Sequence, residues 1–175
     1  MKNLLTLLLL LVFPAFSPAA DAVTPAQRLA TLGLALPPVS PVIANYVPAV
    51  RSGNLVFLAG QVARGADGSI LAGKVGRELT AAEGAAAART CALQLLAALQ
   101  AEIGDLAKVK RIVRVGGFVN CTDDFTAQPQ VVNGASDLLV AVFGDAGRHV
   151  RASVGVNALP AGAPVEIELI AEIAN

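Results

Sequence analysis

The side chains best suited to chemistry lie near the C-terminal end of the chain. Arg151 and His149, the only histidine, alternate with apolar residues and should share one face of a strand. The planar guanidinium of an arginine forms paired hydrogen bonds to a carboxylate, so Arg151 is a candidate anion anchor. In a purely structural alternative, Arg151 only forms an ion pair with Glu166 or Glu168 across the sheet. A lone histidine likewise more often has a structural role than a catalytic one.

Other residues offer less chemistry. Tyr46, the only tyrosine, either lines a binding site or is a half-buried residue with a solvated hydroxyl. The chain has no G-x-S-x-G nucleophile motif and no glycine-rich phosphate loop. One histidine and two separated cysteines form no ligand set for a metal, and no metal site is predicted. Cys91 and Cys121 are compatible with a disulfide or with two buried thiols.

Composition limits the class of partner. The 13 basic and 13 acidic residues give a formal net charge of zero, so no electrostatic surface for nucleic acid or anionic lipid is indicated. Aromatic residues make up only 4% of the chain and tryptophan is absent, which leaves few side chains for stacking on bases. A small molecule is the expected partner.

The first 22 residues have the order of a secretory signal peptide: Lys2, an apolar run over residues 4–13, and then small residues. The apolar run is about half the length that a membrane-spanning helix needs. Cleavage is expected after Ala22, or alternatively after Ala19. The remaining residues, 23–175, have the size of one domain. We therefore expect a periplasmic or secreted protein with no membrane attachment after cleavage.

Helical periodicity and capping signals predict two long helices. One covers residues 81–103, where Thr80 and Glu83 form a capping box. The other starts after Thr122, Asp123 and Asp124, tolerates Pro129 in or near its first turn, and stops at Gly144. The residues expected to face the core are Ala88, Ala92, Leu95, Leu96, Leu99 and Ile103 from the first helix, and Val132, Leu138, Leu139 and Val142 from the second.

Alternating or continuous apolar residues predict the strands. The strand over residues 55–62 follows a hairpin turn and is expected to be central and covered on both faces. The Gly116-Gly117 pair suggests a bulge or a close approach of the backbone. A short helix is predicted over residues 24–34. The predicted strands cover residues 55–62, 108–120, 150–158 and 165–173.

This order of elements describes an α+β protein in which two helices cover one face of a sheet. The other face is only partly polar, because Ile112, Phe118 and Ile170 alternate with the residues that should face the helices. Such a face is expected to meet another subunit rather than water. The sequence therefore predicts a homo-oligomer.

Several strings, in this order, together resemble the RidA family, also called YjgF or L-PSP. The resemblance covers residues 44–173, and the family has a chorismate-mutase-like α+β fold with a mixed sheet and two helices on one face. The strings are Asn45-Tyr46-Val47, Ser52-Gly53-Asn54-Leu55, Ala59-Gly60-Gln61, Phe118-Val119-Asn120, Asp124-Phe125, Arg151-Ala152-Ser153-Val154, Leu159-Pro160 and Val165-Glu166-Ile167-Glu168.

The resemblance implies a homotrimer with clefts between subunits and hydrolysis of reactive 2-imino or enamino acids to 2-oxo acids and ammonia, without a metal or organic cofactor. It implies that Arg151 binds the substrate carboxylate and that Tyr46 lines the cleft. It also implies that Glu168, with a backbone carbonyl near Ser153, positions a water molecule. His149, beside Arg151, and Ser153 are included among the substrate-binding candidates.

Two positions depart from the family pattern. Ser153 stands where the deaminases commonly have cysteine, and Gly155 stands where they often have an acidic residue, so the substrate range is expected to differ. One rival function is a non-catalytic periplasmic trimer that binds a small molecule or acts as a chaperone. A ribonuclease is the other rival, and the neutral charge and low aromatic content disfavour it.

Overall fold

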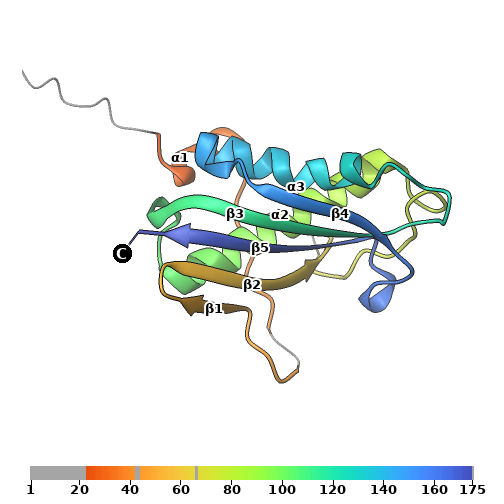
Figure 1. The fold of residues 1–175 in the computed structure, drawn as a ribbon, viewed down its shortest axis with the longest axis horizontal. Coiled ribbons are helices and arrows are strands. Elements are labelled where there is room, and N and C mark those ends of the chain that lie inside the picture. The colour runs from red at the N-terminus through yellow and green to blue at the C-terminus, as the bar shows by residue number, and fades with distance from the viewer. Residues whose placement is uncertain (1–22, 42–43, 66, 175) are drawn as a thin grey trace, which may run out of the picture.

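The computed structural model describes residues 23–41, 44–65 and 67–174, so the predicted signal peptide lies outside the described residues. Five strands form one mixed sheet, and two long helices pack on one of its faces (Figure 1). The strands are β1 (Ala49–Ser52), β2 (Leu55–Val62), β3 (Val109–Asn120), β4 (Val150–Val156) and β5 (Val165–Ile173), and the helices are α1 (Pro25–Thr31), α2 (Ala81–Ile103) and α3 (Gln128–Phe143). This arrangement confirms the predicted α+β class.

Helix α2 has the predicted bounds, and its ends show why. The Thr80 side chain accepts a hydrogen bond from the Glu83 backbone while the Glu83 carboxylate accepts one from the Thr80 backbone, which completes the capping box. Gly104 ends the helix with a φ of 85°, a conformation that a residue with a Cβ rarely adopts. No helix in the described part of the chain is long and apolar enough to cross a membrane.

Helix α3 begins later than the sequence suggested. Its N-cap is Ala127, which has no capping side chain, and Pro129 occupies the first turn. Proline fits there because the first backbone N–H groups of a helix have no intrahelical acceptor. The helix therefore begins at Gln128 rather than directly after Asp124, whereas the predicted place of Pro129 in the first turn and the predicted end at Gly144 are confirmed.

The strand order is β1-β2-β5-β3-β4, so β5 is central and β1 and β4 lie at opposite edges (Figure 1). Only β3 and β4 are parallel, and the other pairs are antiparallel. The expectation that β2 is central and covered on both faces is wrong, since Phe57 of β2 is 42% exposed on the face opposite the helices. A short apolar run by itself does not distinguish these two environments.

The hydrophobic core lies between α2, α3 and the sheet. All of the residues predicted to face the core from the two long helices are buried. Ile112 is also fully buried in this core, opposite Ala171 of β5, so its expected place on the other face is wrong. An irregular register between Ile112 and Arg114 changes the alternation of β3, which a strict two-residue period cannot anticipate.

The two adjacent glycines of β3 allow close packing on both faces of the sheet. A Cβ atom on Gly116 would lie 2.6 Å from the Glu168 carboxylate, and one on Gly117 would lie 2.5 Å from Val132. The predicted close approach is confirmed, while the irregular registers of β3 lie earlier in the strand.

Candidate active site

Arg151 lies on the edge strand β4 and reaches toward helix α3. Its Nη1 atom donates to Asn133 Oδ1 at 2.8 Å and to Ser136 Oγ at 3.0 Å, and Nη2 lies 3.5 Å from the carbonyl oxygen of Pro129. In the described part of the chain, no carboxylate forms an ion pair with this arginine. The guanidinium is therefore fixed by neutral acceptors and keeps an uncompensated positive charge.

His149 stands behind this arginine in a hydrogen-bonded chain. Its Nδ1 atom lies 2.7 Å from the Gly147 carbonyl oxygen, which can only accept, so Nδ1 carries the proton. Nε2 then accepts from Ser136 Oγ at 3.0 Å, and the same oxygen accepts from Arg151. Burial lowers the pKa of His149, and the nearby Arg151 charge lowers it further. Asn133, Ser136, His149 and Arg151 form what we call the Arg151 cluster.

Ser153 follows Arg151 on the same side of β4. Its Oγ atom is buried and has no hydrogen-bond partner among the described residues. An unpaired buried hydroxyl costs free energy unless another molecule supplies a partner. This side of β4 therefore carries a fixed cation, the Arg151 guanidinium, and two residues later an unpaired hydroxyl, that of Ser153.

Tyr46 lies at the other end of the strand order, beside a small cavity of about 210 Å³ that we call the Tyr46 cavity. Its wall includes Glu166 of β5 and Gly60 and Gln61 of β2. Partial burial raises the pKa of Glu166, and the negative charge of Glu168 raises it further. A carboxylate with a raised pKa is better matched to proton transfer near neutral pH than an ordinary one.

Glu168 has a different partner from the one considered in the sequence. Its carboxylate accepts a hydrogen bond from Arg114 Nη1 at 2.6 Å, forming a part-buried ion pair. Glu168 does not line the Tyr46 cavity, and it acts on that cavity through its charge on Glu166. The alternative in which Arg151 pairs with Glu166 or Glu168 is therefore wrong.

Within one chain these residues form two separate groups. Arg151 is aligned with Val115 and Leu169, which are buried against the helices. Glu168 is aligned with Gly116 and, through it, with Ala152, on the opposite face of the sheet. Aligned residues of neighbouring strands point to the same face, so a single chain does not bring Arg151 together with either glutamate.

Sequence reasoning did not select three residues that the geometry brings forward. Asn133 and Ser136 are four and seven residues after Pro129 on α3, a spacing that places them on one helix face. That spacing was a usable signal, but nothing in the sequence indicated that β4 would pack its polar side against this helix. Glu166 had the same alternation as Glu168, and only the position of the Tyr46 cavity distinguishes them.

Neither metal-ligand clusters nor a disulfide occur among the described residues. No group of three or more His, Cys, Asp or Glu side chains there could hold a metal ion. Cys91 and Cys121 are free and buried, and burial raises the pKa of the Cys91 thiol. Both cysteines belong to the hydrophobic core, and Cys121 Sγ accepts a weak hydrogen bond from Gln128.

Comparisons with known proteins agree with this architecture. Residues 26–173 match the family model described as "YjgF/chorismate_mutase-like, putative endoribonuclease". The chain is 46% identical to Protein TCP17 of Trypanosoma cruzi over 151 residues, which cover 86% of this chain and 94% of that protein.

Solved structures give the same result. A protein of unknown function from Agrobacterium tumefaciens is 42% identical with a TM-score of 0.79, covering 86% of this chain and 94% of that one. A "putative endoribonuclease" from Shewanella oneidensis is 35% identical with a TM-score of 0.82, covering 86% of this chain and 99% of that one. RidA from an Antarctic Psychrobacter is 25% identical with a TM-score of 0.55, covering 77% and 94%. From its fold and from matches that span nearly all of the described residues, this chain belongs to the YjgF/RidA (L-PSP) family.

Proposed function

We propose that this protein hydrolyses reactive 2-imino or enamino acids to 2-oxo acids and ammonia. The observation that carries the proposal is the guanidinium of Arg151, which is fixed in place and lacks a carboxylate partner within the described chain. A planar substrate carboxylate would supply that partner through two parallel hydrogen bonds. Membership of a family that includes RidA supports the same reaction class.

The chemistry requires a water molecule and a group that moves its proton. Glu166, with its raised pKa, is the candidate for the group that moves the proton, since it lines the Tyr46 cavity. It would accept a proton from water as the water oxygen bonds to the C=N carbon, and the nitrogen would take up a proton to give a tetrahedral amino-alcohol. Transfer of the hydroxyl proton to the amine nitrogen then allows the C–N bond to break as the C=O bond forms, which releases ammonia and leaves the 2-oxo acid. Glu168 would act on this step through its charge on Glu166.

A complete site would need a second copy of the chain, because the Arg151 cluster and the Tyr46 cavity lie on different faces of one sheet. Apolar side chains on the face opposite the helices support such an assembly: Val150 is 67% exposed, Val154 is 45% exposed and Phe57 is 42% exposed. Several exposed apolar side chains on one face of a sheet are typical of a subunit interface. We therefore propose a homotrimer in which one copy supplies Arg151 and its neighbour supplies Tyr46 and Glu166.

Imine hydrolysis by the purified mature protein tests the function. Imines are generated in situ from several parent amino acids by an amino acid oxidase, and ammonia release is compared with the rate in buffer alone. We expect acceleration for at least one parent amino acid. Binding of the 2-oxo acid without acceleration for any parent would favour the non-catalytic binding protein instead. Cleavage of RNA at physiological salt would favour the ribonuclease.

A further inference from the structure

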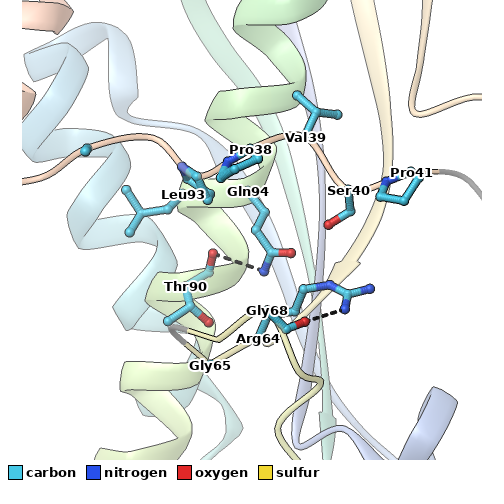
Figure 2. Close-up of a pocket in the computed structure, with 12 residues that line it drawn as sticks. Pro38, Val39, Ser40, Pro41, Arg64, Gly65, Gly68, Thr90, Leu93 and Gln94 are labelled. Carbon is cyan, nitrogen blue, oxygen red and sulfur yellow. Dashed lines mark hydrogen bonds between the residues drawn. The ribbon is translucent and has the colours of Figure 1, made fainter.

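A second and larger cavity, about 690 Å³, lies away from the Arg151 cluster and is the strongest feature of the molecule that the proposed reaction does not use. One wall is the proline-rich segment Pro37–Pro41, and the opposite wall is the face of α2 that carries Thr90, Leu93 and Gln94 (Figure 2). Arg64 and the turn after β2 close a third side. We call this space the strap cavity. Its volume lies in the range of small-molecule sites, and its proline wall is conformationally restricted before any ligand arrives.

The Gln94 side chain leaves a hydrogen-bond acceptor unused in this cavity. Gln94 is only 7% exposed, and its Nε2 atom donates to the carbonyl oxygens of Val62 at 3.0 Å and Thr90 at 3.3 Å. Those two bonds fix the orientation of the amide, because turning it over would place Oε1 against both carbonyls. Oε1 is buried and has no partner among the described residues. A buried amide oxygen without a donor costs free energy, so a ligand N–H or O–H would be favoured there.

Arg64 leaves a donor unused on the other side. Its Nη1 atom donates to the Gly68 carbonyl oxygen at 2.8 Å, which holds the guanidinium in place (Figure 2). Its Nε atom is buried and unpaired, and no carboxylate of the described residues forms an ion pair with it. The cavity therefore combines a fixed cationic donor, a fixed neutral acceptor and an apolar remainder made by the prolines, Val39 and Leu93.

We propose that the strap cavity binds an apolar organic acid that carries a hydroxyl or N–H group next to its carboxylate. The carboxylate bonds to the Arg64 guanidinium, the neighbouring donor bonds to Gln94 Oε1, and the apolar body lies between the proline wall and Leu93. Binding at this site does not depend on imine hydrolysis, and the affinity for a ligand can be measured directly. It shares Ser40, Pro41 and Arg64 with the Tyr46 cavity, so the test must separate the two spaces.

Three probes that differ by one group each test the assignment by calorimetry. They are 2-hydroxy-3-phenylpropanoate, 3-phenylpropanoate, which lacks the hydroxyl, and 2-phenylethanol, which keeps the hydroxyl and lacks the carboxylate. Hydrogen bonds to a charged group contribute most, so we expect the alcohol to bind at least about 10-fold more weakly than the hydroxy acid. Loss of the hydroxyl alone should weaken binding by about 3- to 10-fold. Equal affinity for all three probes, or no binding at millimolar concentration, would overturn the proposal.

Variants then locate the bound probe. Arg64→Gln should weaken binding of both acids by about 10-fold and leave the alcohol unchanged. The matched control is Arg51→Gln, because Arg51 also bonds to a turn carbonyl, that of Gly53, but lies outside the cavity. Gln94→Leu should remove the advantage of the hydroxy acid over 3-phenylpropanoate while keeping the affinity for the latter.

Filling the cavity separates it from the Tyr46 cavity. Leu93→Trp should abolish binding of all three probes, since Leu93 lines only the strap cavity of the two. Gln100→Trp, on an exposed position of the same helix, is the control and should bind like the wild type. Thermal melting checks that each variant is folded. Undiminished binding to folded Leu93→Trp would show that the acid occupies another site and would overturn the proposal.

Discussion

Arg151 is held by three oxygen atoms that carry no full charge: Asn133 Oδ1, Ser136 Oγ and the Pro129 carbonyl oxygen. A carboxylate in their place would fix the side chain equally well but would cancel its charge. Neutral acceptors fix the orientation and leave the charge available to a ligand. The lowered pKa of His149 favours the neutral imidazole. A neutral imidazole neither repels the Arg151 guanidinium nor adds a second charge beside it.

Replacing Arg151 by alanine should remove imine hydrolysis without unfolding the protein. The side chain is on the exposed edge of β4, so its loss leaves no core cavity. Loss of the carboxylate anchor should lower kcat/KM at least ~100-fold, which corresponds to about 3 kcal/mol of transition-state stabilisation. Arg151→Lys should recover only part of the activity, because an ammonium keeps the charge and loses the planar pair of donors.

Arg148→Ala is the matched control, since Arg148 is a nearby exposed arginine whose partner is Asp145 at 3.2 Å. It should keep wild-type kinetics. Wild-type imine hydrolysis by folded Arg151→Ala protein would show that the anchor lies elsewhere.

Replacing Glu166 by glutamine should make the protein more stable at neutral pH. Burial and the Glu168 charge raise the pKa of Glu166 in the folded state, so the folded chain binds that proton more tightly than the unfolded chain. The stabilisation from this proton is complete below the unfolded pKa, near pH 4, and is lost as the pH rises through the folded pKa. The melting temperature of the variant should therefore exceed that of the wild type increasingly from about pH 4 to pH 7.

Glu172→Gln is the control on the same strand and should show the opposite trend. A hydrogen bond from Lys110 lowers the pKa of Glu172, so its contribution is present above the unfolded pKa and is lost as the pH falls. A melting-temperature difference for Glu166→Gln that does not change with pH would contradict the raised pKa.

At the scale of elements, the contact between α2 and α3 determines the position of the α3 residues in the Arg151 cluster. The two helices approach so closely that a Cβ atom on Gly134 would clash with the backbone carbonyl group of Ala85. Gly134 is flanked by Asn133 and lies two residues before Ser136, so the close contact fixes the turn of α3 that holds Arg151. The small residue is thus required by helix packing rather than by a turn.

Gly134→Ala should destabilise the protein by roughly 1–3 kcal/mol in urea unfolding, because backbone atoms of α2 must move to accommodate the methyl group. The control is Gly84→Ala on α2, where the added Cβ meets only side chains of Val131 and Val75 at 3.2 Å. Those side chains can adjust, and alanine favours a helix by about 1 kcal/mol over glycine, so the control should be nearly neutral. A neutral Gly134→Ala would mean that the helices are further apart than described.

For the whole molecule, the two faces of the sheet have different environments. One face is covered by α2 and α3, and the other exposes Val50, Phe57, Val150 and Val154 around the Arg114–Glu168 ion pair. A second copy on this face would bury apolar area and would bring another chain to the residues that one chain leaves apart.

Phe57→Lys should convert the proposed trimer to a monomer, since a lysine ammonium would have to be buried without a partner in the interface. Gln100→Lys, on the exposed side of α2, is the control and should leave the assembly intact. Light scattering at micromolar concentration measures both. A wild-type protein that is itself a stable monomer would contradict the trimer and the shared site.

Export is a separate prediction for the whole chain. We expect the mature protein to begin at Val23, or otherwise at Ala20, because small residues precede both cleavage points. Intact-mass measurement of protein from the periplasmic fraction tests this. Material that retains Met1 would contradict it.

Local patterns by themselves determined most of the elements. The capping box of Thr80 and Glu83 with Gly104 gave both ends of α2, and the alternation of β5 gave its buried and glutamate-bearing faces. These features depend on neighbours within a few residues, so sequence spacing is enough to predict them. The order of the elements predicted the α+β class, and the family strings added the chorismate-mutase-like fold, which the comparisons confirm.

Only the tertiary structure decided which side of β4 faces the helices. Alternation separates Arg151 from Val150 without saying which face is covered, and the polar side packs against α3 while Val150 stays exposed. The choice between Glu166 and Glu168 depended likewise on where Tyr46 and β2 lie. The strap cavity lies between Pro38 and residues of α2 from Thr90 onward, which are more than fifty residues apart in the chain. Such sites arise from long-range packing, and no local period encodes them.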